Sequence, residues 1–201
     1  MYKPLVIFLG GSDGVGKSRV GIELAKKMNI TAHIGTDIIR EIMRSCVSKK
    51  LCEWLHNSAI LISDYAPVNC ENRHIFGFEK QAELVRPAVE AAVHRAIVER
   101  RDMILDGVHL IPGMFELDWY KIRFHHFVIV VNDPDQHRSQ ILGQGVRRSG
   151  YKIENLTRGR EFQRYLVEKA EQYRCKIINN IVLEDAVNEI LRITENDQYP
   201  T

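Results

Sequence analysis

The first residues able to do chemistry form a glycine-rich run that ends in a lysine and a serine. The run fits G-x-x-x-x-G-K-[ST], in which backbone N–H groups surround a phosphate, the lysine reaches the β- and γ-phosphates, and the hydroxyl joins the Mg²⁺ shell. Its members are Gly11, Ser12, Asp13, Gly14, Val15, Gly16, Lys17 and Ser18. An apolar run at 5–9 precedes it and a helical pattern at 20–28 follows, so a helix N-terminus adds its positive dipole end. The loop predicts a bound nucleoside triphosphate, ATP by default.

Two carboxylates follow other predicted strands. Asp106 ends the apolar run 103–105, the Walker-B position, where a carboxylate completes the Mg²⁺ shell together with Ser18. Asp37 follows the predicted strand 31–35 and is a candidate to orient an acceptor hydroxyl and take its proton. The alternatives are a turn cap for Asp106 and a helix N-cap for Asp37. Because parallel strands bind ligands beyond their carboxyl ends, both carboxylates are expected in the crevice of the loop.

Three arginines and a histidine are candidates for binding the charged groups of an acceptor. Arg40 lies three residues after Asp37 on the same side of a helix, where its guanidinium suits a phosphate or a carboxylate. Arg44 follows one turn later, and Arg86 lies on a long predicted helix. His109 lies close to the predicted crevice. A solvated surface position is the alternative for each arginine.

A mobile lid is predicted at 143–152. This segment is rich in glycine and carries Arg147 and Arg148, which a closing loop would bring against the charge that develops on the phosphoryl group. Arg138, on the preceding helix, is expected to stack on the base or touch a phosphate. A basic, solvated loop is the alternative.

The elements that must position these residues alternate between short apolar strands and helices. This order predicts an α/β fold of the P-loop NTPase type, a parallel sheet with helices on both faces. The 201 residues suffice for a single domain, 1–201, with an acceptor-binding helical region at about 37–100. A long helix is predicted at 78–101, and Pro87 is expected to kink or interrupt it.

Composition excludes several classes of protein. The formal net charge of +2 is too small to indicate nucleic-acid binding, and no apolar run approaches the ~20 residues of a membrane span. The four cysteines form no C-x-x-C pair, so we expect free thiols in a reducing cytoplasm. The first strand is predicted to begin at residue 5, and no signal peptide is expected. The oligomeric state is left open, a homodimer included.

Motifs along nearly the whole chain resemble those of the archaeal 2-phosphoglycerate kinases. Besides the phosphate loop, they are I-G-T-D-I-I-R-E-I-M-R at 34–44, G-F-E-K-Q at 77–81, D-G-V-H-L-I-P-G at 106–113, H-R-S at 137–139 and Y-L-V-E at 165–168. The resemblance implies a kinase of the nucleoside-monophosphate-kinase type with a lid. Such an enzyme uses ATP and Mg²⁺ to phosphorylate a hydroxyl on a small phosphorylated acid.

The departures from the family pattern bear on the acceptor. Asp106 stands where the family often has glutamate, and the lid is richer in glycine. Family members commonly carry an additional N-terminal domain, whereas this sequence begins at its first strand. A related archaeal activity, that of mevalonate-3-phosphate 5-kinase in isoprenoid synthesis, suits a stand-alone kinase domain. Both 2-phosphoglycerate and mevalonate 3-phosphate therefore stand as candidate acceptors.

Two functions of other classes remain. A nucleotide-dependent switch or ATPase acting through a protein partner would need a water-orienting residue and a surface that responds to the γ-phosphate. A kinase acting on a nucleic-acid end would need a basic track beside the crevice. The arginines at 158–174 alternate with glutamates, which is typical of a solvated helix and does not favour nucleic acid.

Overall fold

Five short strands form one parallel sheet at the centre of the molecule. The structure is a computed structural model that describes residues 2–57, 66–67, 69–145 and 154–196. The strands are β1 (Leu5–Gly10), β2 (Ala32–Gly35), β3 (Met103–Asp106), β4 (Arg123–Val130) and β5 (Lys176–Asn179), in the order β2-β3-β1-β4-β5. In this register both Leu9 and Gly35 lie opposite Asp106. The polar residues after these strands therefore meet at one edge of the sheet, and the predicted parallel sheet is confirmed.

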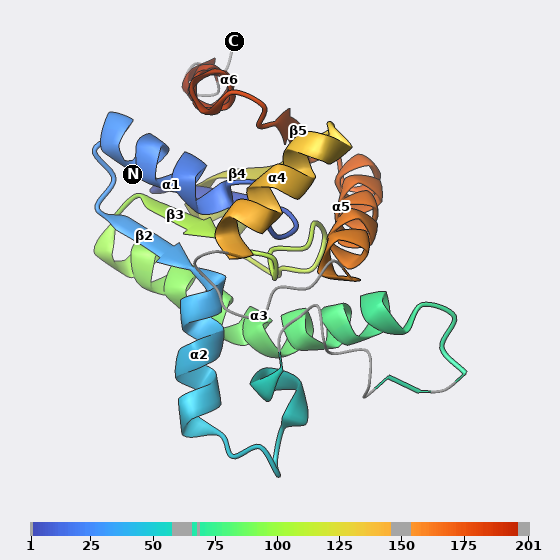
Figure 1. Cartoon of the computed structure of the whole chain (residues 1–201). Coiled ribbons are helices and arrows are strands. Elements are labelled where there is room, and N and C mark those ends of the chain that lie inside the picture. Colours follow the sequence, from blue (N-terminus) through green and yellow to red (C-terminus); the bar gives the residue numbers. More distant parts are fainter. Residues whose placement is uncertain (1, 58–65, 68, 146–153, 197–201) are drawn as a thin grey trace.

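Helices cover both faces of the sheet (Figure 1). Helices α1 (Lys17–Lys27) and α6 (Leu183–Asn196) pack on one face, and α3 (Arg73–Glu99) and α5 (Glu154–Gln172) pack on the other. Helix α2 (Thr36–Cys46) packs against α3, and α4 (Pro134–Gly145) follows β4. The described residues also include the short 3₁₀ turns η1 (Glu53–His56) and η3 (Trp119–Lys121). Side chains of β1 alternate between the two cores, which explains why its sequence is continuously apolar.

The long helix α3 differs from the helix expected at 78–101. Helix α3 begins at Arg73 and continues through Pro87 without the expected interruption. Its buried stripe of Val85, Val89 and Val93 packs along the sheet, and this packing offsets the backbone hydrogen bond that proline cannot make.

The start of α2 also differs from the expectation of a capping side chain. Gly35 occupies the N-cap in an extended conformation, and Thr36 is the first helical residue. No side chain caps this end. The hydroxyl of Thr36 is instead bonded to His109, and the alternative interpretation of Asp37 as the N-cap is wrong.

The structure bears on the expectations about the cysteines and about membrane-spanning helices. All four cysteines are free thiols. In the part of the chain that the structure describes, no helix combines the length and apolar character needed to span a membrane.

Candidate functional site

The phosphate loop leaves the carboxyl end of β1 and enters α1 directly. Gly16 is the N-cap of α1 in the left-handed region, with φ 83°, and a Cβ added there would lie 2.5 Å from the amide nitrogen of Asn180. Glycine is therefore required both by the backbone and by the close approach of Asn180, which follows β5. Helix α1 then begins at Lys17, so its N-terminal N–H groups and positive dipole end point at the loop.

Side chains from distant elements hold the loop in this shape. The Asn180 amide donates to the carbonyl of Val15 at 2.8 Å, and His137 Nε2 donates to the carbonyl of Asp13 at 2.8 Å. The Lys17 ammonium bends back to donate to the carbonyl of Ser12 at 2.7 Å. The loop is therefore braced from β5 and α4, as a preorganised phosphate site requires.

Asp106 lies beside the loop with both carboxylate oxygens engaged. Its Oδ2 accepts from the Ser18 hydroxyl at 2.6 Å, and its Oδ1 lies 2.8 Å from His33 Nε2. Burial raises the pKa of the Asp106 carboxyl, but the hydrogen bonds from His33 and Ser18 together with nearby positive charge lower it more, so the net pKa lies below its usual value. Asp106 is therefore an ionised carboxylate at neutral pH.

Ser18 and Asp106 are suited to be the ligands that a protein supplies to a nucleotide-bound Mg²⁺ ion. A hydroxyl and a carboxylate 2.6 Å apart at the mouth of a phosphate loop are hard oxygen donors. Among the described residues there is no cluster of three or more side chains of the kinds that hold a metal by themselves. This sparse donor set suits an ion that keeps several waters and takes its other oxygens from phosphates.

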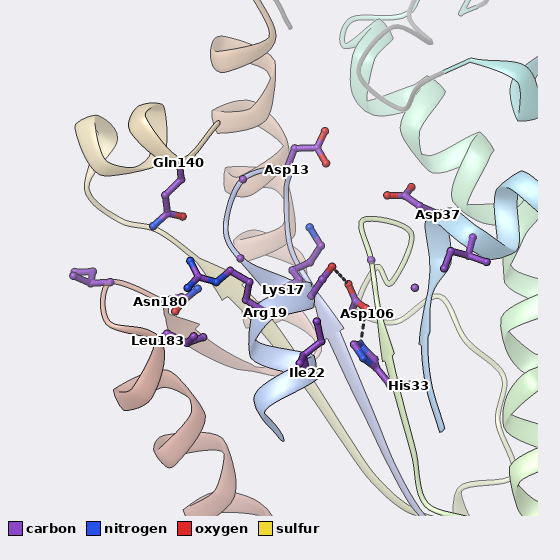
Figure 2. A pocket seen from close by; sticks show the side chains of 17 residues that line it. Asp13, Lys17, Arg19, Ile22, His33, Asp37, Asp106, Gln140, Asn180 and Leu183 are labelled. Atoms are coloured by element: carbon purple, nitrogen blue, oxygen red, sulfur yellow. Dashed lines mark hydrogen bonds and ion pairs between the residues drawn. The ribbon is translucent and has the colours of Figure 1, made fainter. Parts of the chain in front are cut away.

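A cavity of about 980 Å³ opens over the loop and extends to α2 (Figure 2). Its walls contain Lys17, Ser18, Asp106 and Asp37. Asp13, Gly14 and Gly16 of the loop line it too, so the fold brings together seven of the residues predicted from the sequence. Figure 2 shows Asp37 across from Lys17, with Asp106 between them. This arrangement leaves room for two ligands that meet between the loop and α2.

His109 is buried and is bonded to Thr36, which lies between the cavity residues Gly35 and Asp37. Gln81 donates through its amide nitrogen to the carbonyls of Trp54 at 2.6 Å and Asn57 at 2.8 Å, which leaves its Oε1 to accept from His109 Nε2 at 3.2 Å. His109 Nδ1 then accepts from the Thr36 hydroxyl at 2.9 Å. Both ring nitrogens are thus used within the protein, and the hydrogen-bond pattern assigns the neutral Nε2–H tautomer.

Three charged candidate residues influence the pKa of the buried His109 ring. Burial lowers the pKa of His109 to about 4, with Arg40 and Lys17 contributing in the same direction and Asp37 opposing them. Three of the candidate site residues therefore lie close enough to influence one buried ring. The expectation that His109 itself binds the acceptor does not suit a ring whose two nitrogens are already bonded.

The candidate arginines on α2 take different positions. Arg40 is half-buried, and its Nη1 donates to the carbonyls of Leu55 at 2.9 Å and Asn57 at 3.5 Å, in the turn that Gln81 also holds. Arg44 pairs with Glu41 on the exposed surface of the helix. Neither arginine is among the described residues that line the cavity, and Arg40 is the one close enough to influence His109.

The remaining basic candidates lie away from the cavity or outside the described residues. Arg86 donates to the carbonyl of Met114 at 3.3 Å, and Arg138 is exposed on α4. Neither is among the described residues that line the cavity. The lid arginines, Arg147 and Arg148, lie outside the residues that the structure describes, so the lid stays a prediction.

Several cavity residues had not been singled out from the sequence. His33, Asn180 and Arg19 line the wall, with Gln140 and Ile181 at the α4 and β5 side. Asn180 follows the end of β5, so the strand-end rule that selected Asp37 and Asp106 also applies to it. His33 lies within a strand, and no local signal distinguishes it from a core histidine.

Curated proteins similar to this chain are archaeal 2-phosphoglycerate kinases. The enzyme of Pyrococcus furiosus is 36% identical over 192 residues, which cover 94% of this chain and 63% of that protein. The enzyme of Thermococcus kodakarensis is 33% identical over 196 residues, which cover 93% of this chain and 65% of that protein. The chain thus spans less than two thirds of the length of these relatives. No protein-family model matches it.

Solved structures share the fold. A shikimate kinase from Acinetobacter baumannii superposes with a TM-score of 0.59 at 13% identity and covers 99% of this chain and 97% of that one. A Thermus thermophilus protein, TT1252, superposes with a TM-score of 0.55 at 15% identity and covers 98% of this chain and 100% of that one. The fold is therefore of the P-loop kinase type, and the sequence is similar to the archaeal 2-phosphoglycerate kinases along nearly its whole length, as its motifs predicted.

Proposed function

We propose that this chain is an ATP-dependent kinase that phosphorylates a hydroxyl of a small phosphorylated hydroxy acid. The observation that carries the proposal is the single cavity in which the phosphate loop and Asp106 face Asp37. The triphosphate site thus lies in the same cavity as Asp37, a carboxylate suited to a hydroxyl acceptor. The similarity to 2-phosphoglycerate kinases supports the same reaction class.

On the donor side, the loop N–H groups and Lys17 bind the β- and γ-phosphates and offset their charge. Mg²⁺, held by the Ser18 hydroxyl and the Asp106 carboxylate, would add positive charge to the same oxygens. Gln140, Ile181 and Leu183 line the cavity beyond the loop and offer apolar and amide contacts for the base. These residues fix the triphosphate so that its γ-phosphorus faces α2.

On the acceptor side, Asp37 orients the attacking hydroxyl and accepts its proton as the new oxygen–phosphorus bond forms and the bond to ADP breaks. Arg40 supplies positive charge beside Asp37 for the phosphate or carboxylate of the acceptor. The reaction needs positioning and charge compensation and little covalent chemistry from the protein. We retain Arg147 and Arg148 as lid residues that close over the transferring group.

Between the two candidate acceptors, 2-phosphoglycerate is favoured by the relatives that carry its name. Mevalonate 3-phosphate is the second candidate, and a specific observation favours it. Ile38 lines the cavity directly after Asp37 and is 61% exposed, so an acceptor with an apolar backbone would cover it. Covering this side chain would contribute to the binding of mevalonate 3-phosphate and would contribute little with the more polar glycerate.

The test is a coupled ADP-release assay with ATP, Mg²⁺ and either acid. We expect release to depend on one of the two acids, and we expect Lys17→Ala to lower it by at least about 10²-fold because the transferring phosphoryl loses its cation. Lys26→Ala, an exposed change in the same helix, is the matched control and should keep full activity. If neither acid stimulates ADP release from folded protein that binds ATP, the proposed acceptor class is wrong.

A further inference from the structure

His33 reaches the Walker-B carboxylate from the neighbouring strand. Its place in β2 is opposite Ile104 of β3, two residues before Asp106, and its imidazole lies on the α1 side of the sheet. Its Nε2 lies 2.8 Å from Asp106 Oδ1. An ionised carboxylate only accepts hydrogen bonds, so the Nε2–H of His33 is the donor.

Asp106 is thus held from two sides. Ser18 engages Oδ2 and His33 engages Oδ1, and the Asp106 side chain is only 6% exposed. Two donors on opposite oxygens leave the carboxylate a single orientation. A carboxylate in a fixed orientation binds a cation with less loss of side-chain freedom than a rotating one.

Helix α1 leaves room for the imidazole only because residue 21 is glycine. A Cβ added to Gly21 would lie 2.6 Å from His33 Nε2 and 2.9 Å from its Cε1, closer than such atoms approach in proteins. Glycine is unfavourable inside a helix relative to alanine, yet Gly21 is buried in the middle of α1. Clearance for the His33 ring is a physical reason for a glycine at this position.

We propose that His33 is a positioning residue that orients the Asp106 carboxylate toward Mg²⁺, with Gly21 providing the space for its ring. This inference rests on the proposed function, because it takes Asp106 as the carboxylate of a nucleotide-bound metal. In this proposal His33 acts through its hydrogen bond to Asp106. Partners of this kind typically change metal affinity by about 10- to 100-fold when they are removed.

The experiment measures Mn²⁺ affinity for the protein–ADP complex by electron paramagnetic resonance, so that the readout is binding and not turnover. We expect His33→Leu to weaken Mn²⁺ binding by about 10- to 100-fold. His33→Gln places an amide N–H near the former Nε2 and should restore most of the affinity. If His33→Leu keeps wild-type Mn²⁺ affinity, the positioning role is overturned.

The proposed role of Gly21, which is to leave space for the His33 ring, is tested by a substitution in α1. We expect Gly21→Ala to weaken Mn²⁺ binding in the wild-type background and to have no further effect in His33→Ala, because the displaced ring is then absent. Gly159→Ala in α5 is the matched control: an added Cβ there meets only the Cδ1 atom of Ile141, at an ordinary 3.5 Å. If Gly21→Ala lowers Mn²⁺ affinity equally in the wild-type and His33→Ala backgrounds, the proposed role of Gly21 is overturned.

Asp106→Asn separates failure of this inference from failure of the proposed function. If Asp106→Asn leaves Mn²⁺ affinity unchanged, the assignment of Asp106 to the metal is wrong, and the role of His33 falls with it. If Asp106→Asn weakens binding and His33→Leu does not, only the inference about His33 fails. Thermal melts of each variant confirm that the compared proteins are folded.

Discussion

Asp106 ends β3 and Asp37 lies just after β2, yet their surroundings prepare them for different tasks. Ser18 and His33 hold Asp106 in an ionised state and in one orientation, as suits a residue that stays charged throughout a reaction. Figure 2 draws no hydrogen bond or ion pair between Asp37 and the other cavity residues shown. Of the two carboxylates, Asp37 is the one available to exchange a proton with an acceptor.

At this scale we predict that Asp37→Asn lowers turnover by about 10²- to 10⁴-fold and leaves ATP affinity within about twofold of wild type. The amide keeps the shape of the side chain but cannot accept the hydroxyl proton. Steady-state kinetics and ATP titration measure the two effects separately. Glu41→Gln, one helical turn later on the exposed surface, is the control, and equal turnover in both variants would refute the role of Asp37.

At the scale of elements, the acceptor half is held together by a buried polar network. Thr36 at the start of α2, His109 after β3 and Gln81 on α3 form one chain of hydrogen bonds. Gln81 and Arg40 then hold the carbonyls of η1 and the residue after it. The network fixes α2, and with it Asp37, relative to the sheet that carries the donor site.

We predict that Gln81→Leu destabilises the protein by roughly 2–4 kcal/mol, because it removes the acceptor of His109 Nε2–H and a donor to the carbonyls of Trp54 and Asn57. It should also raise the KM for the acceptor more than the KM for ATP. Urea unfolding and steady-state kinetics measure the two effects. Gln172→Leu, exposed at the end of α5, should change neither, and a fully stable Gln81→Leu would contradict the network.

At the scale of the whole molecule, two buried histidines link folding to pH. Burial lowers the pKa of His109 and of His126 to about 4 each, while an unfolded chain binds these protons near pH 6.5. The folded protein keeps both rings neutral. Their contribution to stability is therefore complete above about pH 6.5 and is lost as the pH falls toward 4.

We predict that the Tm falls by several degrees between pH 7 and pH 5. His126 donates to the carbonyl of Leu110 at 3.2 Å, so His126→Gln keeps a donor there but cannot titrate. Calorimetry at pH 7, 6 and 5 should give a shallower fall for His126→Gln than for the wild type. A wild-type Tm that is the same at pH 5 and pH 7 would rule out this linkage.

The donor half and the acceptor half of the site differ in how far the sequence alone predicts them. The donor half depends on eight consecutive residues between a strand and a helix, and the structure has them in that setting. The acceptor half depends on side chains from α2, from α3 and from the loop after β3. Gln81 and His109 are 28 residues apart in sequence and meet only once α3 has packed on the sheet.

By itself, the sequence determined the phosphate loop, the alternating α/β order and the two strand-end carboxylates, because these follow from local spacing and apolar runs. Only the tertiary structure decided that His33 holds Asp106, that Asn180 braces the loop and that His109 is a neutral buried link rather than an acceptor ligand. These contacts join residues brought together by strand order and helix packing. The spacing of residues along the chain does not predict such contacts, since they form only after the sheet has assembled.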